Sequence, residues 1–105
     1  MAVVEISVVP LGVQSVSLSA FVAEALKVLQ KSGLSYELTG MGTIISGDLD
    51  AIWRVLREMH ESCFAQGVTR VLTTIRVDDR RDRVSSSRQK VESVMKRLEQ
   101  EGGEA

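Results

Sequence analysis

The apolar residues of this chain recur with two different periods, and the order of those periods restricts the fold more than any other feature. Alternation of apolar and polar residues in β-branched runs is typical of strands, whereas i, i+3, i+4 spacing is typical of helices. These patterns predict a strand, a helix, two short strands, a helix and a strand over residues 3–9, 18–32, 35–39, 43–46, 49–64 and 70–77. The chain therefore follows the order βαββαβ.

Residues that start or stop helices and strands stand at the borders of these segments. Pro10 ends the first strand, Gly33 closes the first helix, and Asp48 is a good N-cap for the second helix. The segment Gly40-Met41-Gly42 separates the two short strands, and its glycines permit positive φ in a tight connection. The two short strands are therefore expected to form a hairpin.

Right-handed crossovers in this order give a four-stranded antiparallel sheet with two helices on one face, which is the ferredoxin-like α+β sandwich. A further helix is predicted at the C-terminus, where Ser86 and Gln89 form a capping box. Its apolar stripe is narrow and consists of Val91, Val94, Met95 and Leu98. We expect one domain over residues 1–105, with residues 101–105 frayed.

The sheet face without helices is expected to be mixed in polarity. Its polar members are Glu5, Ser7, Glu37, Thr39, Thr74 and Arg76, and its apolar members are Val3, Val9 and Leu72. Such a face is either solvated or covered by another sheet. Association is favoured, because a solvated face would leave the apolar side chains exposed.

Composition excludes several classes of function. A formal net charge of -1 argues against the broad basic surface of a nucleic-acid-binding protein. The single cysteine, Cys63, allows no intramolecular disulfide and suits the reducing cytoplasm. No apolar run reaches the roughly 18 residues of a membrane span, and the N-terminal residues resemble a strand more than a signal peptide.

Three side chains on the second helix deserve separate interpretation. His60 is the only histidine, so it is the sole candidate for imidazole chemistry. A packed, hydrogen-bonded ring is favoured over a ligand contact, and catalysis is least favoured. Trp53 is expected in the core, with stacking on a flat ligand as the alternative. Cys63 shares a face with His60, but a buried, inert thiol is favoured over an activated thiolate.

Two short segments match binding motifs only weakly. Met41-Gly42-Thr43 lacks the length and the lysine of a phosphate-binding loop, and it leads into a strand, so it is either a plain hairpin or a turn that faces a ligand. The segment from Asp78 to Arg83 contains three aspartates and three arginines. Mixed charges of this kind usually form solvent-exposed or intersubunit ion pairs. We find no set of residues sufficient for catalysis or for a metal site.

Three segments in order resemble the thiamine-binding protein family of the YkoF-like superfamily. They are VEISVVPLG at the start, SGLSYELTGMGTIISGDLD in the middle and GVTRVLTTIRVDDRRD near the end. The resemblance implies the ferredoxin-like fold, assembly of sheets into homodimers and then homotetramers, and binding of thiamine or its hydroxymethylpyrimidine portion. The ligand-binding positions that it implies are Ser7, Pro10, Glu37, Thr39, Met41, Gly42, Thr43 and His60.

One position departs from the family pattern. Ser46 stands before Gly47, where these proteins commonly carry an acidic residue that could pair with a cationic ligand. The resemblance thus predicts a cytoplasmic, non-enzymatic homo-oligomer that binds thiamine or a related pyrimidine and uses no cofactor. The alternative is an assembly or regulatory module with a vestigial pocket.

Overall fold

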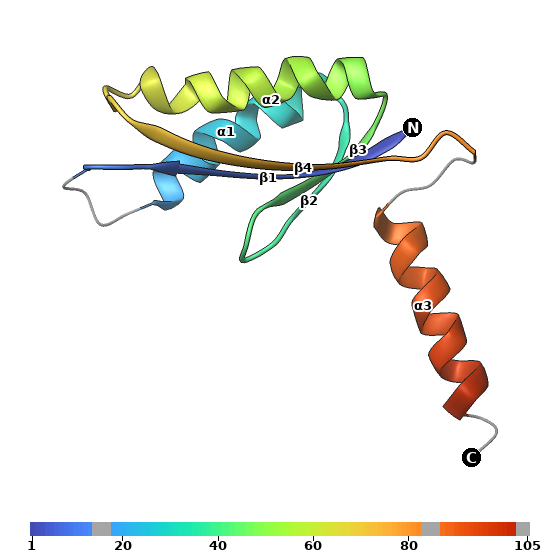
Figure 1. The fold of residues 1–105 in the computed structure, drawn as a ribbon. Helices are drawn as coiled ribbons and strands as arrows, with labels where there is room; N and C mark the ends of the chain where they lie inside the picture. Colours follow the sequence, from blue (N-terminus) through green and yellow to red (C-terminus); the bar gives the residue numbers. More distant parts are fainter. Residues whose placement is uncertain (14–17, 83–86, 103–105) are drawn as a thin grey trace.

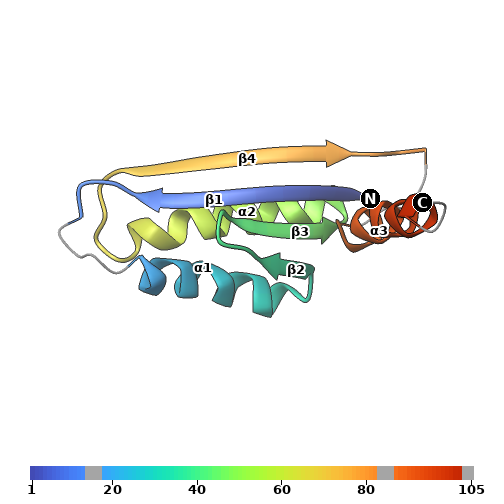
Figure 2. The same cartoon turned by 90° about the horizontal axis from the view of Figure 1, so that it is seen from below.

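A computed structural model describes residues 1–13, 18–82 and 87–102 of the chain. Its elements are β1 (Ala2–Pro10), α1 (Ser19–Ser32), β2 (Ser35–Leu38), β3 (Thr43–Gly47), α2 (Leu49–Phe64), β4 (Val71–Asp79) and α3 (Ser87–Gly102). The strands form one antiparallel sheet in the order β2-β3-β1-β4. Helices α1 and α2 lie on the same face of this sheet (Figures 1 and 2). The predicted ferredoxin-like α+β sandwich is confirmed.

The predicted helix borders are confirmed in detail. Helix α1 ends at Gly33, which adopts φ +75° and so occupies the left-handed region that favours glycine. Helix α2 begins after Asp48, whose carboxylate accepts a hydrogen bond of 3.1 Å from the Ala51 N–H. This bond satisfies one of the amide groups that the first turn of a helix leaves without a partner.

The core lies between the sheet and the two helices that cover it. Its most buried large side chains come from β1 and β3 on one side and from α1 and α2 on the other: Val4, Ile6, Leu29, Ile45, Ile52, Leu56 and Cys63. Trp53 was expected in this core, and that prediction is wrong, because 47% of the residue is exposed. Successive residues of a helix are rotated by about 100° about its axis. Trp53, which follows the buried Ile52, therefore lies at the flank of the apolar stripe of α2.

The hairpin between β2 and β3 forms as predicted, but its glycines serve a different purpose. Neither Gly40 nor Gly42 has a positive φ. A Cβ atom on Gly42 would lie 2.8 Å from the backbone carbonyl oxygen of Ile6, which is too close. Gly42 is therefore required because the hairpin approaches β1 closely, and not because of a left-handed backbone.

Strand β1 has neighbours of unequal length. It pairs with β4 along all of Ala2–Pro10, but with β3 only from Ala2 to Ile6. The edge of β1 that faces β3 is therefore open from residue 7 to residue 10. This mismatch sets the position of a cavity beside β1.

Helix α3 leaves the body of the molecule (Figure 1). The Cα radius of gyration is 16.4 Å, against about 13 Å for a compact domain of 100 residues. The predicted apolar stripe is exposed, with values between 53% and 57% for Val91, Val94, Met95 and Leu98. Residues 101 and 102, which were expected to fray, belong to the helix. Residues 103–105, and Ser86 of the predicted capping box, lie outside the described residues.

The helix-free sheet face is mixed, as predicted. The register places Glu5 opposite Arg76, and their side chains form an ion pair of 3.0 Å. The register also adds Ile44 to this face, directly opposite Glu5. Leu72, another apolar member, is 56% exposed.

The charged segment after β4 forms ion pairs within the chain. Arg80 pairs with Asp82 at 2.6 Å, and Arg81 pairs with Asp79 at 2.8 Å. Arg83 lies outside the described residues. In the described part of the chain, every helix is too short or too polar to cross a bilayer.

Candidate functional site

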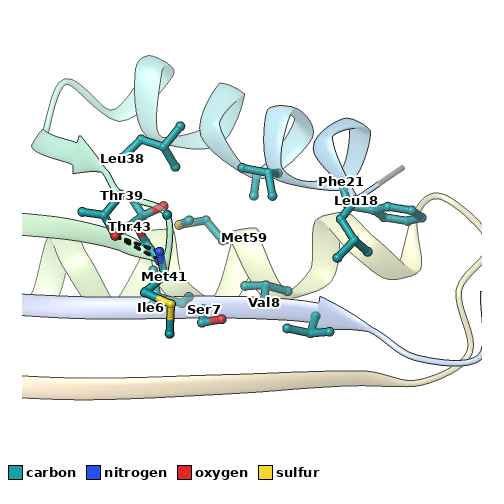
Figure 3. Close-up of a pocket in the computed structure, with 15 residues that line it drawn as sticks. Ile6, Ser7, Val8, Leu18, Phe21, Leu38, Thr39, Met41, Thr43 and Met59 are labelled. Atoms are coloured by element: carbon teal, nitrogen blue, oxygen red, sulfur yellow. Dashed lines mark hydrogen bonds between the residues drawn. The ribbon is translucent and has the colours of Figure 1, made fainter. Parts of the chain in front are cut away.

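A cavity of about 230 Å³, the hairpin cavity, lies beside residues 7–10 of β1, the half of the strand that β3 leaves open. Figure 3 shows side chains from the start of α1, from β1 and from the β2–β3 turn around the same space. The residues that line it are Ile6, Ser7, Val8, Val9, Leu18, Phe21, Val22, Ala25, Leu38, Thr39, Gly40, Met41, Gly42, Thr43 and Met59. The cavity exists because β3 begins at Thr43, opposite Ile6, so no strand fills the space beside Val8.

The turn that forms one wall is held by a single side chain. The Thr39 hydroxyl donates to the Gly42 carbonyl at 2.8 Å and accepts from the N–H groups of Met41 and Gly42 at 3.2 and 3.1 Å. The Thr39 N–H also donates to the Gly42 carbonyl at 2.9 Å. Thr39 therefore positions the turn, and its hydroxyl is already engaged by the backbone.

The other walls are apolar and contain one aromatic ring. Phe21 lies at the start of α1, and the buried Met59 reaches the cavity from α2 (Figure 3). Ala25 lies on the inner face of α1, where its small side chain leaves room. Met41 is 84% exposed at the rim. The aromatic ring available for stacking is thus Phe21, whereas Trp53 is absent from the lining.

Five of the eight predicted ligand-binding residues come together in this cavity: Ser7, Thr39, Met41, Gly42 and Thr43. The structure places the other three elsewhere. Pro10 ends β1, and Glu37 lines a second cavity, of about 290 Å³, together with Ile44 on β3 and Ser87 at the start of α3. Sequence reasoning missed Val8, Phe21, Ala25 and Met59, because strand and helix periodicity assigned their side chains to the core.

The side chain of His60 extends from α2 to β4. Its Nδ1 atom is 2.6 Å from the Thr73 hydroxyl oxygen, and its ring meets the Phe64 ring edge-on with centroids 5.3 Å apart. The ring is therefore packed and hydrogen-bonded, as the structural interpretation of His60 expects. It does not line the hairpin cavity.

Cys63 is buried, with 1% of the residue exposed. Burial raises the pKa of its thiol, an effect that a hydrogen bond with Ser62 partly opposes. A raised pKa keeps the thiol protonated and weakly nucleophilic. Among the described residues, no group of three or more histidine, cysteine, aspartate or glutamate side chains could hold a metal ion.

Ser46, the departure from the family pattern, is buried at the base of α3. Its hydroxyl oxygen lies 3.4 Å from the backbone N–H of Ser87, which donates to it. The residue is 7% exposed. It therefore links β3 to the first turn of α3 and lies outside the lining of the hairpin cavity.

Proteins of similar sequence span the whole length of this chain. The UPF0045 protein YqgV of Bacillus subtilis is 39% identical over 103 residues, covering 94% of this chain and 99% of that protein. A UPF0045 protein of Methanothermobacter thermautotrophicus is 42% identical over 99 residues, covering 93% and 100% of the two chains. The similarity therefore covers nearly all of this chain.

Solved structures share the fold. A hypothetical protein from Methanocaldococcus jannaschii superposes with a TM-score of 0.79 at 34% identity, covering 89% of this chain and 94% of that one. A proposed thiamine biosynthesis/salvage protein from Thermotoga maritima superposes with a TM-score of 0.75 at 22% identity, covering 89% and 97%, which shows the fold alone. The model of the family described as "Thiamine-binding protein" matches residues 4–95. This chain belongs to the thiamine-binding protein family.

Proposed function

We propose that this protein binds thiamine, or its hydroxymethylpyrimidine portion, in the hairpin cavity, and that it acts by binding and not by catalysis. The observation that carries this proposal is that five residues implied by the family resemblance line one cavity. The family itself supports the choice of ligand.

The size and polarity of the cavity favour the pyrimidine portion. Its volume of about 230 Å³ is below the roughly 300–1,000 Å³ of pockets for drug-sized ligands. Phe21 is the aromatic residue of the lining and the candidate for stacking on a flat heterocycle, and among the described residues the lining contains no carboxylate to balance the charge of a thiazolium. The pyrimidine ring therefore occupies the cavity in this proposal, and the thiazolium extends past Met41 toward the exterior.

The same lining supports a non-enzymatic role without a cofactor. General acid–base catalysis needs a positioned group that titrates, and none of the lining side chains is ionisable. The two candidates from sequence, His60 and Cys63, lie outside the lining. Binding thus requires only shape, stacking and hydrogen bonds.

Isothermal titration calorimetry tests the ligand directly. We expect heat with hydroxymethylpyrimidine and with thiamine, and none with hydroxyethylthiazole, which lacks the pyrimidine ring. Absence of heat at millimolar concentrations of both pyrimidine ligands would refute the proposed function. Binding of the thiazole alone would refute the assignment of the pyrimidine to the cavity.

A matched pair of variants tests the location. Ala25→Leu places a larger side chain into the cavity from α1 and should abolish binding, whereas Ala23→Leu adds the same atoms to an exposed position on the same helix. Ala23→Leu should bind as the wild type does. Equal affinities for the two variants would place the ligand elsewhere.

We also propose that the chain self-associates in the cytoplasm, through homodimers that pair into a homotetramer. Two surfaces with exposed apolar side chains support this: the stripe on α3, and the mixed helix-free face, which carries the exposed Leu72. A projecting helix gains little stability from its own sheet, so a second copy is the natural partner for the stripe.

Native mass spectrometry reports the oligomer and any bound small molecule together. We expect the mass of four chains, and Val94→Glu on α3 should reduce it, because a charge within an apolar contact is costly. A monomer at micromolar concentration would contradict self-association. A tetramer that binds neither pyrimidine ligand would instead favour an assembly or regulatory module, for which the exposed stripe on α3 is the supporting observation.

A further inference from the structure

The hydrogen-bond directions of β1 follow from one bond at its end. The Leu11 N–H donates to the Arg70 carbonyl at 2.9 Å, and the register of Pro10 with Val71 makes Leu11 and Arg70 directly opposite. In an antiparallel pair, alternate residues direct both backbone groups to the same neighbour. The odd-numbered residues of β1 therefore bond to β4, and the even-numbered residues direct their N–H and C=O groups toward the side of β3.

Three of these even-numbered residues have partners on β3, and two do not. Ala2, Val4 and Ile6 face Gly47, Ile45 and Thr43, respectively. Val8 and Pro10 lie beyond the end of β3, and proline has no N–H to satisfy. Val8 is thus the one position in the open half of β1 where both an N–H and a C=O point to a missing strand.

The cavity lies against this edge. Residues 6–9 are consecutive and all line it, although strand alternation sends their side chains to opposite faces of the sheet. Side chains alone cannot explain four consecutive lining residues on one wall. The shared wall is therefore the backbone edge of β1, and the Val8 N–H and C=O face the cavity.

We propose that the backbone N–H and C=O of Val8 form a two-point hydrogen-bonding site for a planar ligand edge that carries an acceptor beside a donor. A 4-aminopyrimidine presents such an edge, with a ring nitrogen next to an exocyclic amino group. The ligand edge takes the place of the missing strand residue, as an added strand does in β-augmentation. This inference rests on the proposed function and names the group that selects the ligand.

The site predicts selectivity within pyrimidines. A site built to hydrogen-bond a ligand group rejects an analogue that lacks it, because the protein group is then left buried without a partner. The analogue of hydroxymethylpyrimidine without its 4-amino group keeps the ring and the other substituents but lacks the group that would donate to the Val8 carbonyl. Its affinity should be roughly ten- to a hundredfold lower.

Amide hydrogen exchange followed by NMR tests the Val8 site in two steps, first without and then with ligand. In the free protein, the Val8 amide should exchange much faster than the amides of Ser7 and Val9, which bond to β4. Saturating hydroxymethylpyrimidine should then protect Val8 selectively. A Val8 amide already protected in the free protein would overturn the inference and leave the proposed function standing, as would calorimetric binding without new protection. No binding heat at all would overturn both.

Backbone ester substitution provides a matched pair of variants. Replacing Val8 with its α-hydroxy acid removes an N–H that bonds to no other strand and only weakens the Ser7 carbonyl as an acceptor for β4. Thermal stability should therefore fall slightly, while the affinity for hydroxymethylpyrimidine falls about tenfold or more. The same replacement at Glu5, in the half of β1 that β3 covers, removes a bond to β4 and leaves both backbone groups of Val8 unchanged, so it should lower thermal stability and leave the affinity close to that of the wild type. Unchanged affinity in the Val8 ester would contradict the inference.

Discussion

The two halves of β1 lie in the same strand but in opposite surroundings. From Ala2 to Ile6 the strand has β3 on one side and β4 on the other, and Val4 and Ile6 are at most 1% exposed. From residue 7 to Pro10 it has β4 alone, and a cavity takes the place of β3. The first half is closed by its own fold, whereas the second half leaves backbone groups and apolar surface for another molecule.

The difference arises from strand length alone. Strand β1 and strand β4 each contain nine residues, whereas β3 contains five. Every polar backbone group needs a partner or water, and the short strand leaves that need unmet at one edge. In this fold a cavity with unpaired backbone groups therefore requires only a neighbouring strand that ends early.

The largest expected difference between the two halves is in stability. Ile6→Ala removes a fully buried side chain from the closed half and should lower the free energy of unfolding by about 2–5 kcal/mol. Val8→Ala, at a half-buried position of the open half, should lower it by about 1 kcal/mol. Urea denaturation measures both. Equal losses would show that the open half is packed as tightly as the closed half.

The junction between the halves should be sensitive to a single methyl group. Gly42→Ala places Cβ 2.8 Å from the Ile6 carbonyl oxygen, so the hairpin must move away from β1 at a cost of about 1–3 kcal/mol. The affinity for hydroxymethylpyrimidine should fall as well, since the hairpin is a wall of the cavity. Gly40→Ala is the matched control, because its Cβ would meet no atom within 4 Å. Thermal unfolding and calorimetry of both variants test this; a silent Gly42→Ala would refute the close approach.

A smaller effect is expected from the side chain that orders the turn. Thr39→Val keeps the shape but removes the hydroxyl that joins Met41 and Gly42, so stability should fall by about 1 kcal/mol. Thr39→Ser retains the hydroxyl and should restore most of the stability and of the ligand affinity. If serine and valine behave alike, the hydroxyl does not hold the turn.

The sequence predicts the fold well because local patterns determine it. Periodicity, the Asp48 cap and Gly33 identify each element, and βαββαβ order then leaves few arrangements. The exposure of Trp53 could not be predicted in this way, because residue spacing gives the period of an apolar stripe on a helix but not how far the stripe extends around it. The site is harder to predict, since the opening beside Val8 depends on where β3 begins relative to β1. That register is a tertiary property which the sequence of either strand does not encode alone.

The smallest expected effect on stability comes from an ion pair at the closed end of β1, where Ala2 pairs with Asp79. Arg81 donates two hydrogen bonds to the Asp79 carboxylate, at 3.0 and 2.8 Å, and these lower the pKa of that carboxyl below its ordinary value. A lowered pKa means that the contribution to stability is present above the ordinary pKa of about 3.9 and is lost as the pH falls through the lower folded value. The pair is exposed, so its effect on stability is small. Carboxyl titration by NMR should show the Asp79 pKa rising in Arg81→Gln and unchanged in Arg80→Gln, whose side chain pairs with Asp82 instead. A shift of equal size in both variants would mean that the general charge of the segment, and not the Arg81 contact, lowers the pKa.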